Sequence, residues 1–202
     1  MNSRAEIGRE RRRQIQVRQA FEAGLAKRVH NDTDLADFYL ACGDYIVWSM
    51  ARLHDQDQRI HDLLVERLDP GRTDVREQLA GLNERQAKSR VFTAEFQQAV
   101  EALRDSGASG QAQFEVAAQA FVDLFTSLMA PRKNPFQEHT DVLFTDSDWI
   151  DIAGVSTESL AEEKELYELV ETTAPAGIET ASYTAEHAVG CFFRVGLVPA
   201  QR

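Results

Sequence analysis

The sequence lacks the features that mark secreted, membrane-spanning or disulfide-rich proteins. It has two cysteines in 202 residues, with no further cysteine at metal-ligand spacing, which excludes a disulfide framework. The longest apolar stretch, residues 188–200, is interrupted by Arg194 and is too short to span a bilayer. The arginine-rich N-terminus contains no apolar block of signal-peptide length. We therefore expect a cytoplasmic protein without a transmembrane segment.

Motifs of common catalytic folds are also missing. The chain has no glycine-rich phosphate loop and no G-x-S-x-G nucleophile elbow. Cys42 lies on an apolar helical stripe, where a buried structural thiol explains it better than a nucleophile. Since the net charge is −11 and the isoelectric point is near 4.9, we expect no sequence-specific binding of nucleic acid. The polar residues of the core are left as the candidates for chemistry.

The spacing of apolar residues predicts helices throughout the centre of the chain. No alternating strand pattern occurs in residues 31–172, and prolines at positions 70, 131 and 175 fall where helices should end. Short connections make consecutive helices antiparallel neighbours, so the sequence predicts an all-α, up-down four-helix bundle. An irregular C-terminal docking tail is expected at residues 173–202. The first long helix would bury Leu35, Tyr39, Cys42, Ile46, Met50, Leu53, Ile60 and Leu64.

Helix starts can be placed from residue types that accept hydrogen bonds from the first backbone N–H groups of a helix. Such residues stand at three positions: Asp32 or Thr33, Asp74 with Glu77, and Thr145 with Asp148. Each precedes or opens a stretch with helical apolar spacing.

Charge is unevenly distributed along the chain. Residues 1–30 carry eight basic and three acidic side chains, whereas residues 31–202 carry 14 basic and 30 acidic ones. Apolar residues recur at four-residue intervals from Val17 to Val29, which is typical of a basic amphipathic arm. We expect residues 1–30 to pack on the acidic bundle of their own chain or of a second copy in a homo-oligomer. Nucleic acid or an anionic membrane is the alternative partner.

Three metal-capable side chains interrupt the apolar stripe of the first long helix. On a helical wheel Asp57 lies between Leu53 and Ile60, and His54 and His61 lie within about 60° of it. Spacings of three and four residues let such side chains converge on one ion. Helical bundles hold iron, manganese or zinc with carboxylates and imidazoles on facing helices. The alternative is a solvated helix end, with histidines that cap the core or form hydrogen bonds across it.

A second group of metal-capable residues follows the break at residues 131–135. Glu138, His139 and Asp141 offer both ligand types, but adjacent residues of a helix point in different directions. At most one or two of them are expected to face a shared site.

The second long helix places polar residues on the face that also carries Leu82 and Phe96. These are Gln86, Ser89 and Thr93. They would make the centre of the bundle partly polar, which suits a lined cavity or buried water equally well.

Long antiparallel helices with His54 and His61 facing the core, and Glu138-His139 in a later helix, resemble the hemerythrin-like, or HHE cation-binding, family. The resemblance covers roughly residues 33–172. It implies a non-haem iron centre in a four-helix bundle that serves in oxygen binding, redox sensing or iron handling. The chain departs from the family pattern four residues after each of these histidines, where Gln58, Val65 and Leu143 stand.

Three functions follow as hypotheses. The first is a hemerythrin-like bundle that binds iron through His54, Asp57, His61, Glu138 and His139. The second is a metal-free helical interaction protein in which the polar stripe sets helix register or lines a partner groove. The third is a small-molecule enzyme with a histidine as general base in a cavity lined by Tyr39, Met50, His54, His61, Gln86 and Thr93.

Overall fold

A computed structural model describes residues 3–27, 32–69, 71–128 and 136–178, with the side chains of residues 128, 137 and 138 excepted. All the regular secondary structure in this part of the chain is helical, so the prediction of an all-α protein is confirmed. The α-helices are α1 (Ser3–Ala26), α2 (Thr33–Arg67), α3 (Thr73–Ser106), α4 (Gln111–Leu128), α5 (Gln137–Leu143), α6 (Asp146–Ala153) and α7 (Thr157–Thr173), and a short 3₁₀ helix, η1 (Gly107–Gly110), joins α3 to α4.

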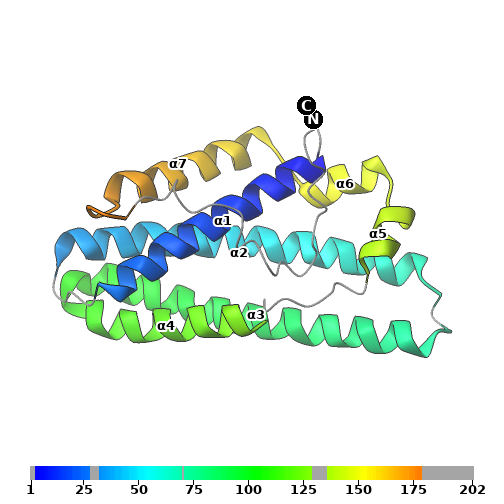
Figure 1. The fold of residues 1–202 in the computed structure, drawn as a ribbon, viewed down its shortest axis with the longest axis horizontal. Coiled ribbons are helices and arrows are strands. Elements are labelled where there is room, and N and C mark those ends of the chain that lie inside the picture. The colour runs from blue at the N-terminus through cyan, green and yellow to red at the C-terminus, as the bar shows by residue number, and fades with distance from the viewer. Residues whose placement is uncertain (1–2, 28–31, 70, 129–135, 179–202) are drawn as a thin grey trace.

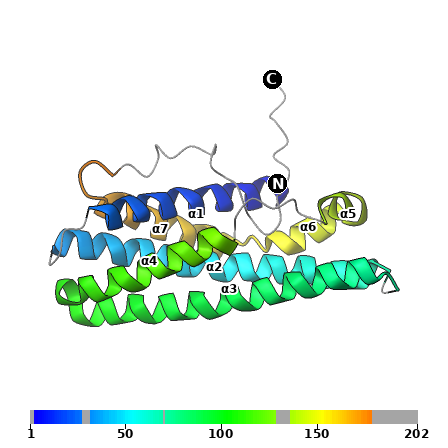
Figure 2. The same cartoon turned by 60° about the horizontal axis from the view of Figure 1, so that its bottom comes forward.

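Helix α2 lies at the centre of the molecule and contacts most of the other helices (Figure 1). Helix α3 runs antiparallel along one side of it, and α4 returns beside α3. Helices α1 and α7 lie on the opposite side of α2 and run in the same direction as each other (Figure 2). The short helices α5 and α6 cover the end of α2 where its C-terminus lies. A polar residue on the buried face of α2 is therefore close to side chains of other helices.

The helix starts agree with the capping prediction at two of three places. Asp32 accepts hydrogen bonds from the backbone N–H groups of Asp34 and Leu35 at the start of α2. The Thr145 and Asp148 side chains form a reciprocal capping box at α6. The expected box at Asp74 and Glu77 is wrong, because α3 already begins at Thr73 after Arg72, and no side chain caps it. The Asp74 carboxylate accepts hydrogen bonds from Arg72 instead.

The core consists of two hydrophobic clusters arranged along α2. The larger one surrounds Phe21, Tyr39 and Phe96 from three helices, and the smaller one gathers around Ile60 and Trp149. All eight residues predicted to be buried on the first long helix are buried. Helix α1 contributes Ile7 to the smaller cluster and Val17, Ala20, Phe21 and Leu25 to the larger.

The described part of the N-terminal segment is thus an integral helix of the core on its own chain. Of the predicted docking tail, residues 179–202 lie outside the described residues, and Ile178 is buried against the larger cluster. Within the described ranges, no helix is both long and apolar enough to cross a bilayer.

Close contact between α2 and α3 depends on the absence of a side chain at Gly43. A Cβ atom at this position would lie 2.7 Å from Cγ2 of Val100. We expect Gly43→Ala to lower the free energy of unfolding by about 1–3 kcal/mol, as overpacking of a dense core does. Urea denaturation followed by circular dichroism measures this.

Gly81→Ala is the matched control, because the nearest atom to a Cβ there is 3.7 Å away. This change should stabilise α3 by about 0.5–1 kcal/mol. Adding Val100→Ala to Gly43→Ala should recover part of the lost stability. If the effects of the two changes are simply additive, the proposed clash is contradicted.

Candidate functional site

The predicted polar residues of α2 do face the interior. Asp57 is fully buried, and His61 and His54 expose only 7% and 9% of their surface. They are positioned by the register of α2, whose apolar residues on the same face form the core. A buried carboxylate costs several kcal/mol unless it is paired, so the partners of Asp57 decide what this site can do.

Asp57 is paired with a cation from the N-terminal helix. Nη2 of Arg11 donates to Oδ1 of Asp57 over 3.2 Å, and both side chains are nearly or completely inaccessible to solvent. Burial raises the pKa of Asp57 to about 6, although the charge and hydrogen bond of Arg11 act in the opposite direction. The pair is electrically balanced and connects α1 to α2.

His54 binds a hydroxyl group on the facing helix. Its Nε2 lies 2.8 Å from Oγ of Ser89, and the Thr93 hydroxyl donates to the backbone carbonyl of Ser89 one turn further along α3. Burial, followed by the nearby positive charge of Arg90, lowers the pKa of His54 to about 4. His54 is therefore neutral at pH 7 and joins α2 to α3.

The register of the antiparallel α2 and α3 pair also places Gln86 near Asp57. The contacts of Gly43 with Val100 and of His54 with Ser89 fix which residues face each other. Asp57 follows His54 by three residues on α2, and Gln86 precedes Ser89 by three residues on α3, so the two face each other in this antiparallel pair. Gln86 is 4% exposed. The polar centre therefore receives side chains from α1, α2 and α3.

Three buried atoms that α2 and α3 contribute to this centre have no hydrogen-bond partner within the described part of the chain. They are Oδ2 of Asp57, Nε2 of His61 and Nε2 of Gln86. The other ring nitrogen of His61, Nδ1, lies 3.3 Å from Oδ1 of Asp62. These atoms include acceptors and donors, which is the combination that a buried water molecule satisfies.

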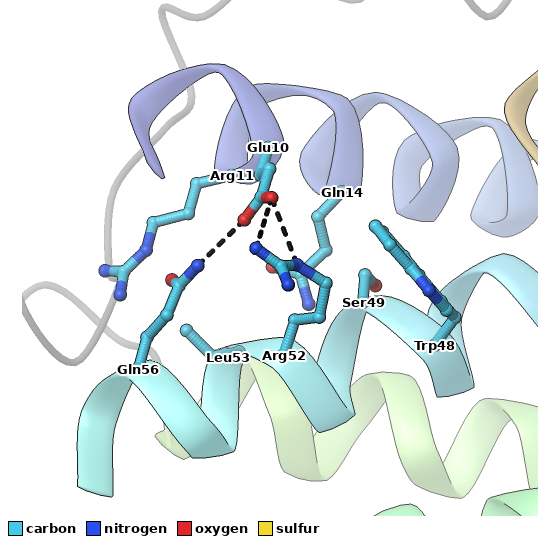
Figure 3. Close-up of a pocket in the computed structure, with 8 residues that line it drawn as sticks. All are labelled: Glu10, Arg11, Gln14, Trp48, Ser49, Arg52, Leu53 and Gln56. Atoms are coloured by element: carbon cyan, nitrogen blue, oxygen red, sulfur yellow. Dashed lines mark hydrogen bonds and ion pairs between the residues drawn. The ribbon is translucent and has the colours of Figure 1, made fainter. Parts of the chain in front are cut away.

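A second polar contact between α1 and α2 lies beside this centre. Figure 3 shows the Glu10 carboxylate of α1 between Arg52 and Gln56 of α2. Arg52 donates to Glu10 over 2.7 and 3.0 Å, and Gln56 donates over 2.8 Å. The adjoining pocket measures only about 10 Å³, which is at most enough for one water molecule. It is too small to be a substrate site.

A third contact joins α1 to α7. Glu163 is 1% exposed, and its carboxylate accepts from Arg9 over 2.9 Å and lies 3.2 Å from Arg13. The hydroxyl of Tyr45 on α2 lies 3.5 Å from the other carboxylate oxygen. Burial, followed by the charge of Glu163, raises the pKa of Tyr45 well above its usual value.

Sequence reasoning missed Glu10, Arg52 and Glu163 as members of the polar core. A signal existed for Glu163, because it stands three and seven residues before Leu166 and Val170 on the buried face of α7. No comparable signal separates Glu10 or Arg52 from the many exposed charged residues of the chain.

The predicted second group of metal-capable residues lies on α5. His139 is half-buried there, with its ring 6.2 Å from that of Phe136, while the Glu138 side chain lies outside the described part of the structure. In the described ranges, no group of three or more His, Cys, Asp or Glu side chains is placed to hold a metal ion.

Charge also argues against a metal ion at the centre. Asp57 is already neutralised by Arg11, so a divalent cation bound to Asp57 and His61 would add two uncompensated positive charges in a fully buried place. The side chains present therefore do not fit a divalent metal ion in this arrangement.

The residues proposed to line a substrate cavity do not form one pocket. Tyr39 and His61 are separated by 22 residues of one helix, which corresponds to about 33 Å. Tyr39 packs among aromatic rings and donates to Glu115, and the sulfur of Met50 accepts from Gln14. These side chains are parts of the packed core at different levels of α2.

The molecule is therefore an all-helical protein with pairs of oppositely charged side chains in its interior. Comparisons with protein-family models, curated proteins and solved structures find no match for the chain. The resemblance to hemerythrin-like proteins stays a prediction from the sequence.

Removing one member of the buried pair should be costly. We expect Asp57→Leu to lower the free energy of unfolding by about 3–5 kcal/mol, because it leaves the Arg11 charge buried without this carboxylate. The double variant Arg11→Met/Asp57→Leu should recover more than half of that loss. A double-mutant cycle from chemical denaturation measures the coupling, and two additive losses would contradict it.

The matched control is the exposed pair of Lys88 and Glu84 on α3, whose side chains are 62% and 68% exposed. Lys88→Ala should change the free energy of unfolding by no more than about 0.5 kcal/mol.

The two pKa shifts should act on stability in opposite directions. The folded protein holds the Asp57 proton more tightly than the unfolded chain, so Asp57 lowers stability as pH rises from about 4 to about 6. The folded protein holds a proton on His54 less tightly, so His54 raises stability as pH rises from about 4 to about 6.5. The two contributions largely cancel in the wild type.

Single variants should reveal each contribution. Relative to wild type, the unfolding free energy of Asp57→Asn should increase with pH across this range, and that of His54→Gln should decrease. Denaturation curves at several pH values give both slopes. Equal slopes for the two variants would show that these groups do not titrate as described.

Proposed function

We propose that this chain is a metal-free helical interaction protein whose buried polar network fixes the register of α1, α2 and α3. One observation carries the proposal: three buried polar residues of α2, Asp57, His54 and Gln56, each contact a side chain of another helix. Asp57 contacts Arg11 of α1, and His54 contacts Ser89 of α3. A shift of one helix turn, about 5.4 Å, would break these contacts and leave charges buried without partners.

The network supports a structural role because Asp57, His54 and Gln56 pair with side chains of other helices, and the described pocket beside it has room for at most one water molecule. Buried polar groups that select one register at some cost in stability are known from coiled coils. In this proposal the working surface of the protein is its exterior, where acidic side chains outnumber basic ones.

Three narrower expectations belong to the same proposal. The helices α2, α3, α4 and α7 would correspond to an up-down four-helix bundle, to which α1 is added. The protein would act in the cytoplasm and would form a homo-oligomer. Sedimentation velocity over a range of concentrations tests the last point, and a monomer at every concentration would contradict it.

A hemerythrin-like iron centre is the competing proposal. It is favoured by Oδ2 of Asp57 and Nε2 of His61, which are buried atoms with donor electron pairs and without hydrogen-bond partners among the described residues. It would require Arg11 to leave Asp57 and further ligands to approach, with His54, His139 and Glu138 as the candidates. Sensing of oxygen or redox state, or metal handling, would then follow.

Metal content distinguishes the two proposals. Protein purified after expression in iron-rich medium should contain transition metals only at background level by elemental analysis, and it should show no ligand-to-metal absorption band. His54→Ala should leave this background unchanged while lowering stability, because Ser89 loses its partner.

Asp55→Asn is the control for His54→Ala, since Asp55 is an exposed residue of the same helix. Near-stoichiometric iron that is lost in both His54→Ala and His61→Ala, but kept in Asp55→Asn, would overturn the metal-free proposal and establish the iron centre.

A further inference from the structure

A groove outside the polar centre lies where α2, α3 and α7 meet. Its volume is about 240 Å³, which is below the roughly 300 Å³ at which pockets for drug-sized ligands begin. A groove of this size suits a single side chain better than a metabolite. It is formed by Asp44, Val47, Trp48, Gln97, Val100, Glu101, Arg104, Glu162 and Leu166.

The floor of the groove is apolar. Val100 is buried, and Val47 and Leu166 are half-buried beside the indole of Trp48. Covering such a floor with the methylene groups of a ligand is favourable by about 25 cal/mol for each Å² of apolar surface removed from water. The occupant should therefore carry an aliphatic stem.

The rim of the groove has an unbalanced negative charge. Its single basic side chain, Arg104, is already bound to Asp44 at 2.5 Å. Glu101 of α3 accepts a hydrogen bond from the neutral amide of Gln97, and among the described residues neither Glu101 nor Glu162 forms an ion pair with a basic side chain. Two carboxylates from different helices thus flank an apolar floor without a counter-charge, and a cation between them would relieve their repulsion.

We propose that this groove receives a lysine or arginine side chain from a basic segment of a partner protein. The aliphatic stem would lie on Val47, Val100 and Leu166, and the charged end would lie between Glu101 and Glu162. Long basic side chains combine an apolar stem with a charged end in this way. The acidic rim disfavours phosphate groups, and a neutral side chain would leave both carboxylates partly desolvated without a partner. This inference rests on the proposed function as an interaction protein and names the chemistry of the partner.

Binding can be tested on the full-length protein by nuclear magnetic resonance. The probe is an acetylated and amidated peptide with one lysine between two leucines, and the reporter is the indole N–H signal of Trp48, assigned with Trp48→Phe. We expect saturable shifts of this signal. Replacing the lysine by norleucine, which keeps the stem but removes the charge, should weaken binding about tenfold.

Variants of the rim supply the second comparison. Glu101→Gln/Glu162→Gln should abolish the preference for lysine over norleucine, and both positions are exposed, so the fold should be retained. Glu168→Gln is the control for a carboxylate outside the groove, because it removes one negative charge from an exposed position of α7 that does not line the groove. It should leave the preference unchanged.

Several outcomes would overturn the inference: no shift of the Trp48 signal, equal binding of the two peptides, or an undiminished preference in the rim variant. If n-butylammonium binds as tightly as the lysine peptide, the occupant is a free amine and the assignment to a partner segment is wrong. None of these results bears on metal content or on self-association, so they leave the proposed function to its own tests.

Discussion

Ion pairs between α1 and its neighbours are the contacts on which the rest of the structure depends. Arg11 reaches Asp57 and Glu10 reaches Arg52 on α2, while Arg9 and Arg13 reach Glu163 on α7. Because these pairs point in two directions from one helix, they hold α1 and α7 together over α2. They act with the apolar residues of α1 that enter both hydrophobic clusters. Since one partner in each pair is nearly buried, none of them can be replaced by water without a large cost.

The same pairs determine which partners the most suggestive residues of α2 have in this structure. Helix periodicity brings His54, Asp57 and His61 to one buried face, as ligands would require. The neighbouring helices supply their partners, because Arg11 neutralises Asp57 and Ser89 lies within hydrogen-bond distance of His54. A buried carboxylate needs a partner, and a guanidinium ion from the same chain supplies it with balanced charge.

Much of the fold could be predicted because local rules determine it. Asp32 and Thr145 cap helices through contacts a few residues away, and the burial of Leu53 and Ile60 follows from a period of 3.6 residues. The polar core was predicted less well. Glu163 stands among other acidic residues, and only its place on the α7 stripe separates it from them. Glu10 and Arg52 pair across 42 positions of sequence, and no local pattern indicates which charged residues will meet.

The order of amino acids alone determines that this protein is helical, where most of its helices begin and end, and which face of each helix is buried, because propensity, capping and periodicity act within a few residues. The excess of basic residues in the N-terminal segment likewise predicts that this segment packs against acidic side chains. Only the packing of the helices decides that these acidic side chains lie on α2 and α7 of the same chain. The packing also decides that Asp57 and His54 on the polar stripe of α2 contact Arg11 of α1 and Ser89 of α3. The reason is that burial and electrostatic pairing depend on distances between segments far apart in the sequence, and those distances exist only in the folded molecule.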